Sequence, residues 1–219
     1  MIADRVCFIV AAGDCYEEKL QIREQDFLVA VDGGYDTVRK MGLEPDLVLG
    51  DFDSVQSEPV AKECVRLKRE KDETDTLYAV QLMAERGYRY IAIYGGTGGE
   101  RISHTVSNLQ TLIAFSKLHL FLMDREEAMF VLADGEIHFS KDCQGMLSVF
   151  SLSEESMGVS ERHLKYQLED TKLIHGYPVG VSNEFIGEES IVAVKKGMLL
   201  LCMEKSQLSG IKKWISYEK

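Results

Sequence analysis

The sequence predicts an α/β fold class: a Rossmann-like, parallel-sheet domain followed by an all-β domain. In the first half, short apolar and β-rich runs recur, with helix-compatible segments between most of them. Strands buried on both faces and separated by helices are typical of a parallel sheet with right-handed crossovers. After about residue 124, short β-rich segments and turn signals continue without a convincing helical period, which predicts strands alone.

The first half supplies both strands and helices. Its predicted strands lie at 6–10, 27–31, 47–50, 64–67, 90–95 and 118–123. The clearest helices are predicted at 75–86 and 104–115, where apolar residues recur at helical spacing, and Gly87 can cap the first of them. We expect this α/β domain to span residues 1–123.

The second half, residues 124–219, is predicted to form the all-β domain. The stretch AMFVLADGEIHFS is typical of a hairpin that turns at Asp134 and Gly135. MLSVFSLS alternates like a strand, and SIVAVKKGMLLLCM predicts a second hairpin that turns near Lys196 and Gly197. The join between the domains, at 124–128, is charged and short.

Composition excludes several classes of function. The 219 residues carry a net charge of −11, which argues against a nucleic-acid partner and against an anionic membrane surface. Apolar runs reach about six residues, whereas a membrane-spanning helix needs about 20. The N-terminus lacks the features of a signal peptide. The five cysteines are scattered and form no CxxC pair, so we expect free thiols and a cytoplasmic location.

Two carboxylates follow the predicted strand at 47–50. Asp51 and Asp53 lie two residues apart in LVLGDFDSV, and their glycine and aspartates are also ordinary turn formers. Two carboxylates about 4 Å apart repel by about 1–4 kcal/mol, and a divalent cation reverses the sign of that interaction. The motif is therefore either a turn or part of a Mg²⁺ site, since Mg²⁺ is often held by one or two carboxylates and substrate phosphates.

The next acidic motif, KDETD, lies at a predicted helix start. Asp72 and Asp75 flank Thr74, and acids or threonine at such a position cap a helix and complement its dipole without any metal. Their spacing of three residues also permits both carboxylates to face one side of the first turn. Lys71, beside them, is a candidate contact to a phosphate.

A glycine-rich segment, YGGTGGERISH at 94–104, joins a predicted strand to a predicted helix. Its glycines allow backbone N–H groups to approach an anion, and the helix N-terminus favours negative charge. The segment lacks both the GK[ST] of a P-loop and the third glycine of the dinucleotide fingerprint. Arg101 strengthens the phosphate interpretation because a guanidinium binds phosphate bidentately. His104 is either a ligand-facing donor or a structural histidine.

Two further loops carry weaker signals. AVDGGYD at 30–36 is another strand end with an aspartate and paired glycines, and by itself it is typical of a turn. In the second half, Gly180, Ser182 and Asn183 form a polar loop among strands, which by itself reads as a β-turn. The two acidic motifs and the glycine-rich segment of the first half each follow a predicted strand. Open parallel sheets bind ligands at the carboxyl ends of their strands, so this shared placement favours a common site.

These motifs, in this order, resemble the thiamine pyrophosphokinase (thiamine diphosphokinase) family. The resemblance covers about residues 30–184 and rests on VDGGYD, PDLVLGDFDSV, KDETDT, GGTGGERISHTVSNL, LKYQL and GVSNE. It implies Mg²⁺-dependent transfer of pyrophosphate from ATP to the hydroxyl of thiamine, with release of AMP. It also implies a homodimer with shared active sites, an α/β catalytic, ATP-binding domain and a β-sandwich thiamine-binding domain.

The resemblance assigns roles by position. The implied catalytic residues are Asp51, Asp53, Asp72 and Asp75. The implied metal-binding residues are Asp51, Asp53, Asp75 and Asp46. ATP is expected at Lys71, Gly95, Gly96, Thr97, Gly98, Gly99, Arg101 and His104. Thiamine is expected at Ser182 and Asn183, and Ser182 is a candidate to serve the active site of a second subunit.

One position departs from the family pattern. Where the family usually has Asp-His or Asp-Gln after the glycine loop, this chain has Ser103 and His104. Ser103 can cap the helix but supplies no charge. The alternatives are therefore a catalytically impaired thiamine- or nucleotide-binding protein, or a pyrophosphokinase for another alcohol such as a pterin. Asp75 is the candidate proton acceptor, although the reaction does not require a dedicated base.

Overall fold

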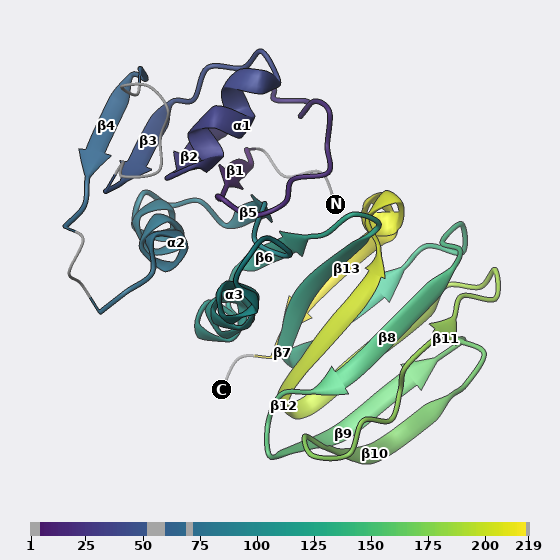
Figure 1. The fold of residues 1–219 in the computed structure, drawn as a ribbon. Coiled ribbons are helices and arrows are strands. Elements are labelled where there is room, and N and C mark those ends of the chain that lie inside the picture. Colours follow the sequence, from purple (N-terminus) through teal and green to yellow (C-terminus); the bar gives the residue numbers. More distant parts are fainter. Residues whose placement is uncertain (1–4, 52–59, 69–71, 218–219) are drawn as a thin grey trace. The chain divides into compact units, whose positions relative to one another are not determined.

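The computed structural model of the chain describes residues 5–51, 60–68 and 72–217. It divides into two compact units (Figure 1). The α/β unit comprises Ala3–Ala114 and Leu118–Arg125, and the β unit comprises Phe115–Lys117 and Glu126–Lys219. Each unit is described below by itself.

The α/β unit is built on a parallel sheet. Its strands are β1 (Cys7–Val10), β2 (Phe27–Val31), β3 (Leu47–Gly50), β4 (Glu63–Arg66), β5 (Tyr90–Tyr94) and β6 (His119–Met123). They lie in the order β6-β5-β1-β2-β3-β4, and every pairing between neighbours is parallel. The short runs of Val, Ile and Leu that predicted β2, β3 and β5 are buried, as expected for strands covered on both faces. β4 differs because it is the edge strand, and most of its residues are exposed.

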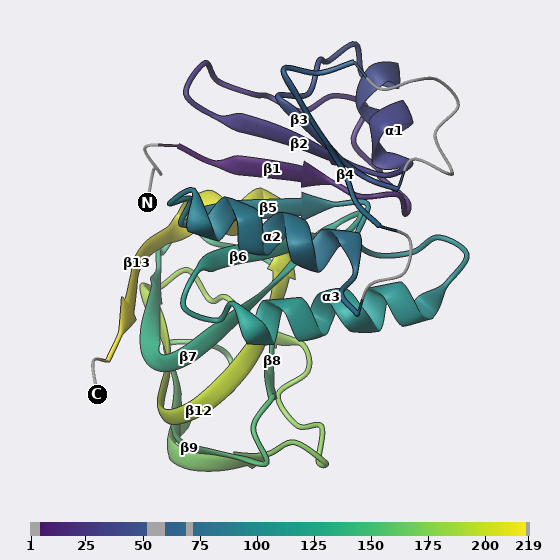
Figure 2. The same cartoon turned by 90° about the vertical axis from the view of Figure 1, so that its left-hand side faces the viewer.

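Helices pack on this sheet. They are α1 (Gly34–Lys40), α2 (Asp75–Glu85) and α3 (Ile102–Ala114). α1 contacts β1 and β2, α2 contacts β1, β2 and β3, and α3 contacts β6 and α2 (Figure 2). Thr74 caps α2 by accepting a hydrogen bond from the Leu77 N–H (3.2 Å). Gly87 ends the same helix in a left-handed conformation, as the sequence predicts.

The strand order creates a switch point beside β1. From β1 the chain builds outward through β2, β3 and β4 on one side, and then returns to place β5 and β6 on the other. The loops that follow β1 and β5 therefore diverge from adjacent strand ends. In open α/β sheets this is where ligands bind.

The β unit consists of antiparallel strands. They are β7 (Glu127–Phe139), β8 (Met146–Ser151), β9 (Glu155–Arg162), β10 (Leu168–Ile174), β11 (Asn183–Glu184), β12 (Ser190–Glu204) and β13 (Ile211–Ser216), with a 3₁₀ helix, η1, at Lys205–Gly210. β12 pairs with β7 along one edge. Along its other edge it pairs first with β9 and then with β8.

The two hairpins predicted in this half are wrong. Asp134 and Gly135 lie inside β7, and Lys196 and Gly197 lie inside β12. The two sites face each other across one ladder, where the register shifts between Val194 and Met198. Asp134 Oδ1 accepts a hydrogen bond from the Gly197 N–H (2.8 Å), so the turn-forming residues build a bulge instead of two turns.

The bulge lets one long strand bond to two different partners. β12 bonds to β9 through residues 191–196 and to β8 through residues 199–203. Gly135 is a glycine for a separate reason: a Cβ there would lie 2.1 Å from the Ile215 carbonyl oxygen of the neighbouring β13. Within the described part of the chain, no helix combines the length and apolar character needed to cross a lipid bilayer.

Candidate active site

Loops from several strand ends line one cavity at the carboxyl edge of the parallel sheet. Its volume is about 720 Å³. Residues after β1, β2, β3 and β5 line it, together with the starts of α2 and α3. These lining residues are Ala11–Asp14, Val31, Asp32, Asp51, Thr74–Thr76, Gly95, Gly96, Gly98–Arg101, His104, Ser107 and Asn108.

A cluster of three carboxylates lies on one side of the cavity. Asp32 follows β2, Asp51 follows β3 and Asp75 begins α2. Asp32 Oδ1 accepts a hydrogen bond from the Asp51 N–H (3.2 Å). Burial, a side-chain hydrogen bond with Asp75 and the charges of Asp75 and Asp51 raise the pKa of Asp32 to about 7. Burial and the neighbouring negative charges therefore disfavour the ionised form of Asp32.

Backbone geometry holds Asp32 in this cluster. Asp32 has a φ of 47°, in the left-handed region, and its N–H donates to the Leu49 carbonyl (3.0 Å). Gly50, with a φ of 150°, leaves room for it: a Cβ at Gly50 would lie 1.8 Å from Asp32 Oδ1. The glycine before Asp51 is thus required by the carboxylate of the neighbouring strand.

The glycine-rich loop forms the other side of the cavity. A Cβ at Gly95 would lie 2.4 Å from the Ala11 carbonyl oxygen, so the loop after β5 packs directly on the backbone after β1. The buried Asn108 of α3 donates from Nδ2 to the Gly96 carbonyl (2.7 Å). Asp14 Oδ2 accepts from the Gly99 N–H (3.0 Å). These contacts fix the loop before any ligand arrives.

The described lining residues are acidic in balance. They include the carboxylates Asp14, Asp32, Asp51, Asp75 and Glu100 against the guanidinium of Arg101. A polyanion such as a nucleotide triphosphate would meet more negative than positive charge here. Among the residues that the structure describes, no three His, Cys, Asp or Glu side chains are arranged to hold a metal ion by themselves. Two carboxylates completed by phosphate oxygens and water remain the arrangement that Mg²⁺ commonly takes.

The β unit presents a second polar loop, at residues 180–184. Gly180 and Ser182 both have left-handed φ values, of 89° and 59°. The Ser182 N–H donates to Ser148 Oγ (3.0 Å), and the Val149 N–H donates to the Gly180 carbonyl (2.9 Å). The loop is therefore anchored to β8, and the side chains of Val181 and Ser182 are exposed.

Two family models match this chain, and both describe the same enzyme family. The model of the thiamin pyrophosphokinase catalytic domain matches residues 19–122, and the model of the thiamin pyrophosphokinase vitamin B1 binding domain matches residues 135–199. The chain belongs to the thiamin pyrophosphokinase family.

Individual thiamin pyrophosphokinases show the same relation. The thiamine pyrophosphokinase of Bacillus subtilis (strain 168) is 28% identical over 187 residues, covering 81% of this chain and 87% of the relative. The thiamin pyrophosphokinase 1 of Caenorhabditis elegans is 28% identical over 174 residues, which cover 72% of this chain and 71% of the relative. The crystal structure of the Bacillus subtilis enzyme superposes with a TM-score of 0.81 at 25% identity, covering 91% of this chain and 98% of that one.

The structure brings many of the predicted site residues of this thiamin pyrophosphokinase together. Asp51 and Asp75 meet beside the cavity, which is also lined by Gly95, Gly96, Gly98, Gly99, Arg101 and His104. Thr97 lies elsewhere: it is buried and donates from Oγ1 to Asp124 Oδ1 (2.6 Å). Asp72 is exposed and does not line the cavity. Asp53 and Lys71 lie outside the described residues.

Asp46 is not placed with the other predicted metal ligands. It precedes β3, whereas Asp51 follows that strand, so the two lie at opposite ends of it. Asp46 Oδ2 accepts from the Leu28 N–H (2.9 Å), and Oδ1 pairs with Lys62 Nζ (2.7 Å). Its carboxylate therefore joins β2 and β3 at their amino ends, and we do not carry Asp46 into the proposed metal site.

Asn183 also has a different placement from the one its predicted ligand role suggests. It is 3% exposed. Its Nδ2 donates to Glu161 Oε2 and to the Tyr166 carbonyl (2.7 Å each), and its Oδ1 accepts from the Tyr166 and Glu184 N–H groups (2.9 Å each). The amide has used its hydrogen-bonding capacity inside the protein. Asn183 thus organises the 180–184 loop, and Ser182 is the exposed member of the predicted pair.

Sequence reasoning did not assign Asp32, Asp14 or Asn108 to the site. Asp32 lies in VDGGYD and Asn108 in HTVSNL, both inside stretches that carry the family resemblance, but each motif alone is typical of a turn or a helix face. Asp14 follows β1 in AAGD. The usable signal was position after a buried strand: Asp32 directly follows β2, and Asp14 lies in the loop after β1.

Proposed function

We propose that the α/β unit binds ATP in this cavity and that the chain transfers the pyrophosphoryl group to the hydroxyl of thiamine. The thiamine oxygen bonds to the β-phosphorus, the bond from that phosphorus to the α,β-bridging oxygen breaks, and AMP leaves. One observation carries the proposal: a carboxylate cluster and a glycine-rich loop line a single cavity in a chain of the thiamin pyrophosphokinase family.

The glycine loop is the proposed site of the phosphates. Its backbone approaches the cavity without side chains at Gly95, Gly96, Gly98 and Gly99. Arg101 and His104 stand at the start of α3, a 13-residue helix whose N-terminus favours an anion. The contact of Asp14 with the Gly99 N–H marks a donor that a phosphate oxygen can take over. Phosphoryl transfer depends mainly on such positioning and charge neutralisation.

The carboxylates of Asp51 and Asp75, beside Asp32, fit a Mg²⁺ ion whose remaining positions would be filled by phosphate oxygens and water. The observation behind this is the raised pKa of Asp32, caused first by burial and then by the hydrogen bond with Asp75 and the charges of Asp75 and Asp51, because a divalent cation would stabilise the ionised carboxylates. Oxygen donors of this kind are the ligands that Mg²⁺ prefers. When bound, Mg²⁺ supplies positive charge that orients and neutralises the phosphates. We keep Asp75 as the candidate acceptor of the hydroxyl proton, because it lines the cavity at the start of α2.

Thiamine is proposed to bind at the 180–184 loop of the β unit. This loop lies within the span matched by the vitamin B1 binding-domain model, and Ser182 exposes its side chain there. Large apolar side chains are also exposed near the loop: Met146 on the strand that pairs with β11, Tyr166 bonded to Asn183, and Val181. We propose that a second subunit covers part of this surface in a homodimer with shared active sites.

The fold type of each unit and the location of the protein in the cell are also proposals. We interpret the α/β unit as Rossmann-like because of its strand order around β1. We interpret the β unit as a sandwich because β12 serves two partners on one edge. All five cysteines lie in the described part of the chain and form no disulfide there, which supports a cytoplasmic location.

An assay of AMP release tests the proposed function. The purified chain is incubated with ATP, Mg²⁺ and thiamine, and AMP and thiamine diphosphate are quantified together. We expect equal amounts of both products, and no AMP without thiamine. AMP release with a hydroxymethyl pterin but not with thiamine would instead identify another acceptor. Binding of both substrates without product would identify a catalytically impaired protein and would overturn the proposal.

A further inference from the structure

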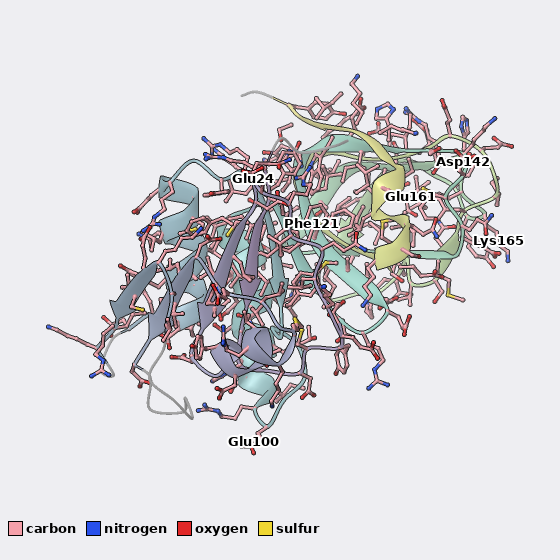
Figure 3. The ribbon with its side chains drawn as sticks, turned by 90° about the horizontal axis from the view of Figure 1, so that it is seen from above. Glu24, Glu100, Phe121, Asp142, Glu161 and Lys165 are labelled. Atoms are coloured by element: carbon pink, nitrogen blue, oxygen red, sulfur yellow. The ribbon has the colours of Figure 1, made fainter. Side chains whose placement is uncertain are left out.

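The β unit buries a carboxylate that has an incomplete set of partners. Glu161, labelled in Figure 3, lies on β9. Its exposed fraction is 1%. Its Oε2 accepts a hydrogen bond from Asn183 Nδ2 (2.7 Å), while Oε1 has no hydrogen-bond partner among the described residues. Burying a carboxylate oxygen without a donor is costly. Burial raises the pKa of Glu161 to about 7, and the hydrogen bond from Asn183 acts in the opposite direction.

The oxygen without a partner lies under the 180–184 loop. Glu161 Oε1 is 3.9 Å from the point where a Cβ on Gly180 would stand. The Gly180 carbonyl accepts a hydrogen bond from the Val149 N–H (2.9 Å), which ties this glycine to β8. A Cβ at Gly180 would lie 2.5 Å from the Val149 carbonyl oxygen, so the backbone itself packs closely here.

Asn183 links Glu161 to the 180–184 loop through hydrogen bonds. Its amide joins three segments: β9 through Glu161, the segment before β10 through Tyr166, and the loop through Glu184. An amide that makes two donor and two acceptor contacts has one orientation that satisfies all of them. Removing the Glu161 acceptor would free Asn183 to rotate and would leave a buried N–H unpaired.

The loop depends on that anchor. Gly180 and Ser182 adopt left-handed backbone conformations, and such a conformation at a non-glycine residue persists only when surrounding contacts hold it. On the β8 side these contacts come from Ser148 and Val149, and on the β9 side they come through Asn183. Contacts to both β8 and β9 therefore fix the position and orientation of the exposed Ser182.

We propose that Glu161 is a positioning residue for thiamine, acting through Asn183 to hold Ser182 and the 180–184 loop in their substrate-binding conformation. This inference rests on the proposed binding of thiamine at that loop. Every described residue that lines the ATP cavity belongs to the α/β unit, so a change at Glu161 should affect one substrate and spare the other.

Steady-state kinetics with variants of Glu161 test the inference. Glu161→Leu removes the acceptor and should raise KM for thiamine about 10-fold, with KM for ATP and kcat changed less than about threefold. Glu161→Gln keeps an acceptor oxygen for Asn183 and should restore KM for thiamine to within about threefold of the original. The same two substitutions at Glu155 are the matched controls, because Glu155 is on β9 but is exposed and pairs with Lys172.

The outcomes separate the inference from the proposed function. An original chain that releases no AMP with thiamine contradicts the function itself. An active chain in which folded Glu161→Leu keeps its KM for thiamine overturns only the role of Glu161, as does an equal rise in KM for both substrates. If Glu161→Leu does not fold, Glu161→Asp, which draws the carboxylate back by one methylene, must still raise KM for thiamine selectively.

Discussion

At the scale of single residues, the site is defined by three carboxylates that are brought together from different strand ends. Asp51 and Asp75 belong to motifs that were visible in the sequence, whereas Asp32 lies in a motif that is typical of a turn. Asp32 is held in a left-handed conformation by its contacts with β3. That conformation is a tertiary effect, which explains why the sequence alone did not identify this residue.

Replacing Asp51 by Asn should lower kcat for AMP formation on the order of 10²–10³-fold, since one negative donor of the proposed metal site is lost. The melting temperature should stay the same or rise, because the replacement relieves repulsion with Asp32. Asp46→Asn is the control and should keep activity within about threefold, because Asp46 lies at the other end of β3. Near-normal activity of Asp51→Asn would contradict the metal site.

The buried Glu161 predicts how stability depends on pH. Its pKa in the folded protein is about 7, above the ordinary value of 4.5, so the folded state binds more protons than the unfolded state between these values. The contribution of Glu161 to the free energy of unfolding should therefore be fully present below about pH 4.5. It should be lost as the pH rises through 7, which lowers the free energy of unfolding by at most about 3 kcal/mol. Urea unfolding at pH 5 and pH 8 measures this loss.

Glu161→Gln provides the comparison for that measurement. A glutamine does not titrate, so its free energy of unfolding should fall less between pH 5 and pH 8 than that of the original chain. Glu155→Gln, at an exposed position, should leave the original pH dependence in place. An identical loss in all three proteins would show that other groups cause it.

At the scale of elements, glycines decide several backbone paths. Gly50→Ala should lower both activity and stability, because the added methyl would lie 1.8 Å from Asp32 Oδ1 and the φ of 150° disfavours a side chain. We expect a loss of about 1–3 kcal/mol in the free energy of unfolding and a fall in kcat of about 10-fold or more. Chemical denaturation and the AMP assay measure the two effects.

Gly176→Ala is the matched control for Gly50→Ala. No atom of the described residues lies within 4 Å of a Cβ at Gly176, and its φ does not fall in the left-handed region. It should change the free energy of unfolding by less than about 0.5 kcal/mol. A Gly50→Ala variant that behaves like this control would show that the cluster tolerates displacement of Asp32.

The elements differ in how well the sequence predicted them. The buried strands of the parallel sheet and the helices α2 and α3 follow from composition and period, whereas α1 has only seven residues and shows no usable period. The Asp134–Gly135 and Lys196–Gly197 pairs were misinterpreted as hairpin turns. Residues that tolerate positive φ serve a turn and a bulge equally well, and only the partner strand decides between them.

At the scale of the whole molecule, charge is the dominant constraint on the reaction. The chain has a net charge of −11, and carboxylates outnumber basic groups among the described residues of the cavity. Removal of divalent metal with EDTA should therefore abolish AMP formation. MgCl₂ should restore it, while NaCl at the same ionic strength should not, because screening cannot replace a coordinated ion.

The metal prediction has a clear contrary result. Activity that survives EDTA, or that NaCl restores, would show that phosphate charge is balanced by the basic groups of the protein alone. Arg101 would then carry that role in the described part of the site.

The whole-molecule prediction from sequence was stronger than the prediction of any single residue. Several weak motifs in one order indicated the family, and the family models match the chain over most of its length. The same resemblance misplaced Asp46, because a motif written in sequence does not show at which end of a strand a residue lies. The limits of the two domains, at residues 123 and 124, stay a prediction.

The central position of β12 in the β unit has a consequence for the order of events during synthesis. All residues of the α/β unit precede residue 126, so that unit is available to fold as soon as Arg125 has left the ribosome. β7 and β8 are synthesised soon afterwards. They cannot complete their pairing with β12, which both contact, until residue 204 has been added. During that interval their edges are exposed, which makes a pause or truncation before β12 the point of greatest risk of aggregation.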